Sequence, residues 1–233
     1  MGLPSRLWTR VERAWRSPTL RNLLYLYAVQ AANYLFPFIT LPYLARVLGP
    51  EGFGKLALAQ ALSLYFYMLL EYALSLSATR EVSKWRHELQ VLRGILSGVL
   101  AARWLLLLPA GAMALLVLYF FPPLRGEAGL VGGSFLLAMG TGLSPAWFFQ
   151  GVERMGPVAL MEFSVRFLAT LGIFFLVRSP AQVAWPLYLQ ALAALAVSFV
   201  GFLWAVSWVG SAQDSERDGF GSGEVLASFS LAW

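Results

Sequence analysis

Ionisable residues inside long apolar stretches are the positions of this chain that could do chemistry. They are Glu71, Arg103, Glu162 and Arg166. A charge at the centre of a membrane helix costs about 2.5–3.5 kcal/mol, so such residues usually pair, line a water-filled pathway or relay protons. Arginine also binds phosphate well. We therefore interpret these side chains as candidates for binding an anionic substrate or coupling its movement to an ion.

Glu162 and Arg166 are one helical turn apart. The 12 Leu, Ile, Val and Phe residues between Pro157 and Val177 favour insertion by about 4–7 kcal/mol, whereas the two charges cost about 5–7 kcal/mol if central. Their spacing lets them pair on one face, which should point into a helix bundle. We interpret Glu162 mainly as half of a structural ion pair and Arg166 as a cation of a cavity wall.

Glu71 and Arg103 each allow two interpretations. Glu71 lies about two turns inside the end of its apolar stretch. It is either a proton site that couples transport to an ion or the partner of an arginine. Arg103 lies either within the membrane or, beside Trp104, at the inner interface. The 14 Leu, Ile, Val and Phe residues between Gly94 and Phe121 outweigh one arginine, so this helix is predicted to insert in either case.

Composition identifies the elements that must position these side chains. The chain of 233 residues is 59% hydrophobic and 12% charged, with a mean hydropathy of +0.67, which is typical of a polytopic membrane protein. We predict an all-α fold with six transmembrane helices. Their expected ranges are 23–45, 53–79, 95–121, 129–149, 157–177 and 185–209. A seventh apolar run begins near Val225 and stops at Trp233, so we expect a truncated seventh helix.

Basic residues predict the orientation and the division of the chain. Eleven Lys and Arg residues fall on the side of the N-terminus and only four on the other, so the N-terminus should be cytoplasmic. We expect a basic cytoplasmic segment at 1–21, a six-helix lobe at 22–209 and a cytoplasmic linker at 210–224. The start of the seventh helix follows at 225–233.

Several classes of function are disfavoured by what the sequence lacks. There is no cysteine and one histidine, His87, which leaves no Cys or His cluster for a metal. No Gly-rich phosphate loop is present, and no loop is large enough for the catalytic carboxylates of a membrane glycosyltransferase or polymerase. The basic residues are better read as topology signals than as a nucleic-acid surface. We predict a transporter without a cofactor rather than an enzyme.

The stretch NYLFPFITLPYLARVLGPEGFGK, from Asn33 to Lys55, is predicted to be a bent helix that lines a pathway. Its prolines are tolerated in a membrane when neighbouring helices or a cavity satisfy the freed carbonyls. Gly49 and Pro50 should form a turn, and Gly52 and Gly54 should let the next helix approach closely. Arg46 would cap the first helix, either as an interfacial cation or as one that faces a cavity.

Two further stretches carry recognisable patterns. In PAWFFQGVERMG, Pro145 can bend the fourth helix, and Trp147 with the two following phenylalanines is expected at the membrane interface. The glycines at 132, 133, 140 and 142 suit close helix packing or a hinge. In SATR, from Ser77 to Arg80, the second helix is expected to end at the cytoplasmic face.

Three segments, LPYLARVLGPEGFGKLALAQ, SLSATREVSKWR and PAWFFQGVERM, occur in the order and spacing of a known family. The chain from about 22 to 233 resembles the N-terminal half of the polysaccharide (O-antigen, Wzx-type) flippases of the multidrug/oligosaccharidyl-lipid/polysaccharide exporter superfamily. The resemblance implies a two-lobed bundle around an alternately opening cavity, of which one lobe is present. The residues that match the family motifs are Arg46, Gly49, Gly54, Ser77, Ala78, Thr79, Arg80, Trp147, Gln150, Gly151 and Glu153.

The resemblance implies export of an undecaprenyl-pyrophosphate-linked oligosaccharide across the bacterial inner membrane for O-antigen, capsule or exopolysaccharide synthesis. Asn33, Arg46, Arg103 and Arg166 are then candidates to line the cavity. A polysaccharide polymerase and assembly proteins are candidate partners. The alternatives are a drug or cation antiporter of the same superfamily and a non-transporting membrane assembly subunit. We also expect that the 233-residue chain cannot export polysaccharide alone, because one lobe forms only one wall of the cavity.

Overall fold

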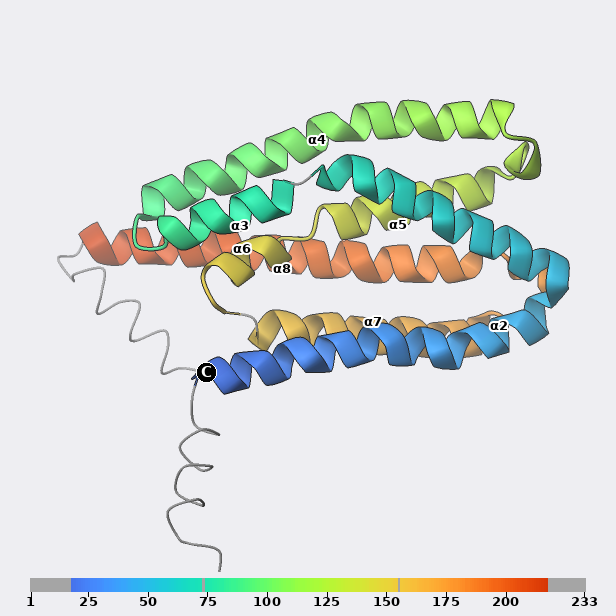
Figure 1. The fold of residues 1–233 in the computed structure, drawn as a ribbon, viewed down its shortest axis with the longest axis horizontal. Coiled ribbons are helices and arrows are strands. Elements are labelled where there is room, and N and C mark those ends of the chain that lie inside the picture. Colours follow the sequence, from blue (N-terminus) through green and yellow to red (C-terminus); the bar gives the residue numbers. More distant parts are fainter. Residues whose placement is uncertain (1–17, 73, 155, 218–233) are drawn as a thin grey trace, which may run out of the picture.

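A computed structural model describes residues 18–72, 74–154 and 156–217, all of them in helices or in the turns between helices. Figure 1 shows long helices that run side by side along one axis. No strand occurs among the described residues, and the predicted all-α membrane fold is confirmed. The helices are α2 (Pro18–Glu71), α3 (Leu74–Lys84), α4 (Leu89–Phe120), α5 (Ala128–Gly142), α6 (Ala146–Gly151), α7 (Gly156–Leu176) and α8 (Trp185–Arg217). Two short 3-10 turns, η1 (Pro122–Leu124) and η2 (Pro180–Gln182), complete the connections.

Five helical stretches of the described chain are long and apolar enough to cross a membrane. The first of these is not straight, because Gly49 adopts φ 70° and ψ 175° inside α2. This left-handed region is open to glycine without strain. Figure 1 shows that α2 reverses direction here, so its two arms occupy the first two of the six predicted spans. The predicted seventh helix, from 225 to 233, lies outside the described residues, as does most of the basic N-terminal segment.

Two of the predicted spans are broken in the structure. The span predicted at 53–79 is interrupted at Tyr72, whose φ is 26°, and α3 then continues to Lys84 rather than closing at Arg80. The span predicted at 129–149 is divided between α5 and α6 at residues 143–145. Pro145 explains the second break, because proline lacks an N–H group and disfavours helical geometry in the residue before it. The first break carries no such local signal.

α5 is the central helix, and its small residues let two neighbours approach closely. A Cβ atom on Gly140 would lie 2.8 Å from the Ala194 Cβ and 2.9 Å from the Leu195 backbone nitrogen in α8. On Gly142 it would lie 3.0 Å from Leu70 in the second arm of α2. Hydroxyl groups add hydrogen bonds, since Ser198 Oγ donates to the Gly140 carbonyl at 2.5 Å. The close packing expected from the glycines of this helix is therefore present.

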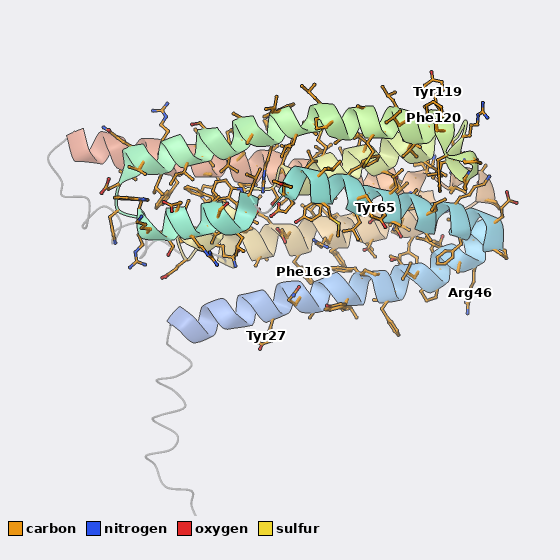
Figure 2. All side chains as sticks on the ribbon, turned by 45° about the horizontal axis from the view of Figure 1, so that its top comes forward. Tyr27, Arg46, Tyr65, Tyr119, Phe120 and Phe163 are labelled. Carbon is orange, nitrogen blue, oxygen red and sulfur yellow. The ribbon has the colours of Figure 1, made fainter. Side chains whose placement is uncertain are left out.

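α7 packs beside the first arm of α2. The rings of Phe36 and Phe163 have centroids 5.4 Å apart, and Figure 2 shows Phe163 between the two helices. Nearer the turn, Tyr43 Oη donates to the Val177 carbonyl at 2.8 Å. In Figure 1 these two helices form the edge of the bundle opposite α4.

The Gly49 turn lies at the same end of the bundle as η1 and η2 (Figure 1). There Lys55 Nζ lies 2.9 Å from Glu127 Oε1, which ties the second arm of α2 to the start of α5. The close approach predicted for two glycines holds for only one of them. A Cβ on Gly52 would lie 3.1 Å from Val183, whereas one on Gly54 would have no atom within 4 Å. Gly54 faces open space, so the expectation for this residue was wrong.

Candidate functional site

Arg103 lies near the middle of α4 and connects the two helix breaks. Its side chain is only 3% exposed, and its guanidinium points to groups on both broken helices. Because α4 is continuous from Leu89 to Phe120, it holds this charge at a fixed depth between them. We call Arg103, Glu71, Ser75 and Ser144 the Arg103 cluster.

The first half of the Arg103 cluster spans the break between α2 and α3. Arg103 Nη2 donates to Glu71 Oε2 at 3.2 Å and to Ser75 Oγ at 2.6 Å. Glu71 is the last residue of α2, and Ser75 is the second residue of α3. One nitrogen thus joins both sides of the break. Of the two interpretations of Glu71, the structure shows the pairing with an arginine.

The second half of the cluster lies at the break between α5 and α6. Arg103 Nη1 donates to the Ser144 carbonyl at 2.9 Å. Within an intact helix this carbonyl would accept from the N–H of Phe148, but that N–H donates to Pro145 instead. The Trp147 ring centre lies 5.9 Å from the guanidinium carbon. The arginine therefore satisfies a carbonyl that the helix break has freed.

These contacts decide what Arg103 does in this conformation. A buried charge is tolerated when it is paired and hydrogen-bonded, and removing one partner is strongly destabilising. Arg103 makes such bonds to three groups, while its Nε has no hydrogen-bond partner among the described residues. The guanidinium is closed to a substrate here and holds the breaks together. Its contact with a substrate stays a prediction.

Glu162 and Arg166 do not form the close pair that their spacing suggested. No ion pair within 4.0 Å joins them in the described part of the chain. Glu162 is partly buried and Arg166 is exposed. Both lie inside the apolar span Val158–Leu176. An exposed cation therefore stands near the middle of a membrane-spanning helix.

The other cavity candidates lie on the first arm of α2. Arg46 is exposed, and Figure 2 shows it at the end of this arm, close to the Gly49 turn. The first arm ends at the Gly49 turn, so Arg46 lies in the last turn of this arm, where a basic side chain is favoured by the helix dipole. Asn33 lies within α2, and its side chain is outside the described residues. Arg46 and the Arg103 cluster are not brought together.

Two of the three family-like segments meet at the opposite end, where α3 packs on α6. Thr79 Oγ1 donates to the Trp147 carbonyl at 3.1 Å. A Cβ on Gly151 would lie 2.5 Å from Val82, so α6 requires glycine at this contact. Ala78 is buried in the same cluster, and Arg86 Nη1 lies 3.4 Å from Glu153. Ser77, Arg80 and Gln150 are exposed around this contact.

The aromatic residues of α6 are buried inside the bundle. Trp147, Phe148 and Phe149 are 5%, 0% and 3% exposed, and Phe149 stacks on Trp204 of α8 with ring centres 4.8 Å apart. α6 packs against α3 and α8, and the expected position of these rings at the membrane interface stays a prediction. Sequence reasoning also missed Ser75 and Ser144. The only signal for Ser144 was the proline that follows it.

Comparison with known proteins gives one family and two curated relatives. Residues 19–220 match the model of a family described as polysaccharide biosynthesis protein. A protein of Escherichia coli (strain K12) named "Putative O-antigen transporter" is 29% identical over 192 residues, which is 82% of this chain and 46% of the relative. A protein of the same name from Shigella dysenteriae is 31% identical over 170 residues, covering 73% of this chain and 42% of the relative. The chain thus spans less than half the length of these relatives, and no solved structure matches it.

Proposed function

Because this chain belongs to the family of polysaccharide biosynthesis proteins, we propose that it forms one lobe of a lipid-linked oligosaccharide flippase. The substrate is an undecaprenyl-pyrophosphate-linked oligosaccharide, carried outward across the bacterial inner membrane by alternating access. The names of the two relatives support an export role. The identity of the substrate lipid rests on the family resemblance that the motifs at Arg46–Gly54, Ser77–Arg80 and Trp147–Glu153 carry.

The exposed arginine of α7 is the observation that carries this proposal. Arg166 stands near the middle of an apolar span, where a charge that faced lipid would cost several kcal/mol. The helix face that bears it must therefore meet water, a substrate or another protein segment. A cationic side chain there suits the pyrophosphate of the substrate, since phosphate oxygens accept the paired hydrogen bonds that a guanidinium donates.

The neighbouring arm of α2 also carries exposed side chains. Tyr27 and Tyr34 are 71% and 75% exposed, and α7 packs against this arm through Phe36. We define the transport surface as the exposed side chains Tyr27, Tyr34, Arg46 and Arg166. A second lobe would face this surface and close the cavity, and the pyrophosphate would contact Arg166 during passage.

The Arg103 cluster supplies the joint that such a movement needs. It lies at two interruptions of helices, and discontinuous helices are common where transporters bind substrates or change shape. Because Arg103 bonds to both interruptions, the segments on either side can tilt while the charge keeps its partners. Arg103 is thus proposed as a positioning residue, and Arg166 as the cation that contacts the substrate.

The test replaces the N-terminal half of the E. coli relative with this chain and measures O-antigen export in a flippase-deficient cell. Arg166→Ala should abolish export at an equal amount of membrane-inserted protein, because the phosphate loses its cation. Arg166→Lys should retain part of it. Arg125→Ala, at an exposed arginine outside both the transport surface and the family motifs, is the matched control and should export normally.

Each alternative predicts a different result. Normal export by Arg166→Ala would make this arginine structural and would remove the basis for the phosphate contact. A chimera that exports cationic dyes but no O-antigen would identify a drug antiporter. A chain that reaches the membrane and restores neither activity would favour an assembly subunit.

A further inference from the structure

A groove lies between α4 and α8, in a different place from the transport surface. Its volume is about 490 Å³, within the range of roughly 300–1,000 Å³ that is usual for small-molecule sites. Leu96 and Val209 form the buried floor, and Trp104, Phe202 and Val206 form the walls. In Figure 1, α4 lies along the edge of the bundle opposite α7 and the first arm of α2. The groove is therefore separate from the proposed path of the oligosaccharide.

The groove follows one face of α4 along the helix axis. Its α4 residues recur at helical spacing from Arg93 through Ser97 and Ala101 to Trp104. At a rise of 1.5 Å per residue, this distance is about 16 Å, close to the depth of about 15 Å of one leaflet of the hydrocarbon core. The length of the groove thus matches the acyl chain of a membrane lipid.

Polarity is concentrated at one end of the groove. Arg93 and Ser97 are both exposed there, whereas the floor and walls beyond them are apolar. Arg93 stands at the end of the bundle that carries Arg80, Lys84 and Arg86, which are also exposed. A cation at the mouth of an apolar groove is complementary to an amphiphile with an anionic head and a hydrocarbon tail. Small side chains, Ala101 and Gly210, leave the space for that tail.

We propose that this groove binds one anionic phospholipid, with its phosphate at Arg93 and an acyl chain lying towards Trp104. The bound chain ends beside the turn of α4 that carries Arg103, the residue that joins the two helix breaks. The lipid would fill the space between α4 and α8. This site would make the chain sensitive to the anionic lipid content of the membrane. That sensitivity would not depend on the substrate that the protein transports.

The experiment uses the complete chain in nanodiscs of phosphatidylcholine that contain phosphatidylglycerol as a minor component. Native mass spectrometry counts the lipids that remain bound as the collision energy is raised, and titration gives their affinity. One phosphatidylglycerol should remain on the wild-type protein. Arg93→Gln should weaken its binding about fivefold, the attraction expected of one basic residue for an anionic surface. Arg93→Lys should retain most of the affinity.

A second variant tests the apolar part of the site. Ala101→Phe places a ring in the groove while leaving Arg93 unchanged, so it should also displace the bound lipid. Arg80→Gln removes an exposed arginine at the same end that does not line the groove, and it should bind phosphatidylglycerol as the wild type does. Circular dichroism and gel filtration check that each variant is folded.

The proposal has clear contrary outcomes. It is wrong if Arg93→Gln and Ala101→Phe retain phosphatidylglycerol like the wild type, or if phosphatidylcholine binds the groove equally well. Preference for a polyprenyl phosphate would instead place the tail of the transport substrate here. If either variant fails to fold, wild-type protein with a photoreactive acyl chain on phosphatidylglycerol decides. Cross-links confined to 96–104 and 202–209 support the site, and cross-links spread over all helices overturn it.

Discussion

At the scale of single residues, Arg103 combines two functions that usually belong to different side chains. It neutralises the Glu71 carboxylate and also satisfies a backbone carbonyl freed by Pro145. Lysine has one nitrogen and could not reach both sides with the same geometry. The identity of the residue, and not only its charge, is therefore required by the two breaks.

Arg103→Ala is expected to lower the free energy of unfolding by about 3–5 kcal/mol, because it leaves Glu71 without its partner inside the bundle. Unfolding of the chain in mixed micelles by a denaturing detergent would measure this change. Arg80→Ala should change it by less than about 0.5 kcal/mol, as expected of an exposed site. The double variant Glu71→Leu with Arg103→Met should recover much of the loss, since neither charge is then buried. Equal stability of Arg103→Ala and Arg80→Ala would show that the pair contributes nothing.

At the scale of helices, α5 determines how closely the bundle is packed. Its glycines bring the backbone of α8 within the distance at which a single added carbon atom collides with main-chain atoms. Main-chain atoms cannot rotate away as a side chain can. The contact between α5 and α8 is therefore specified by the absence of side chains on one of the two helices.

Gly140→Ala should destabilise the protein by about 1–3 kcal/mol, because the new Cβ would force α5 and α8 apart. Gly54→Ala is the matched control in a helix, since its Cβ would meet no atom within 4 Å. It should be neutral or stabilising by up to about 1 kcal/mol. Thermal unfolding in detergent compares the two. A Gly140→Ala protein as stable as Gly54→Ala would contradict the packing described here.

The positions of most helices could be predicted from the sequence, but the contacts between helices that are distant along the chain could not. Apolar runs gave α4, α7 and α8, and the Gly49 turn followed from a Gly-Pro pair. The break at Tyr72 contains no glycine or proline. The residue before it, Glu71, accepts a hydrogen bond from Arg103, which is 32 residues further along the chain. The Glu162 and Arg166 pairing was inferred from local spacing, which shows that two residues share a face and leaves open whether they meet. The buried Trp147 was missed for a related reason, since its burial depends on α3 and α8.

At the scale of the whole molecule, eleven Lys and Arg residues of the sequence are predicted on the side of the N-terminus and four on the other. Five of the eleven, Arg80, Lys84, Arg86, Arg93 and Arg154, lie in or near the turns between α3 and α4 and between α6 and α7, and Figure 1 shows these turns towards one end of the bundle. The four on the other side are Arg46, Lys55, Arg125 and Arg178. Both ends contain ion pairs, since Lys55 contacts Glu51 and Glu127 and Arg86 contacts Glu153. Basic residues are retained on the cytoplasmic side during insertion.

Reporter fusions should therefore be active outside the cell when placed after Glu51, Gly126 or Ser179. Fusions after Lys84, Arg154 or Asp214 should be active inside. The enzymes for this test are an alkaline phosphatase, which is active outside, and a cytoplasmic β-galactosidase. The reversed pattern at Glu51 and Lys84 would overturn the orientation and place the lipid groove in the outer leaflet.

The pairing of Glu71 with Arg103 also has a consequence for the time course of synthesis. The ribosome adds about 5–20 residues per second, so the arginine follows its partner, 32 residues earlier in the chain, by about 2–6 seconds. During that interval the α2 hairpin reaches the translocon with an unneutralised carboxylate. Until α4 arrives, the nascent chain holds Glu71 without the arginine that pairs with it in the folded bundle. In a chain that lacks Arg103 this pairing never forms, so its first defect would be slower membrane integration, before any substrate is met.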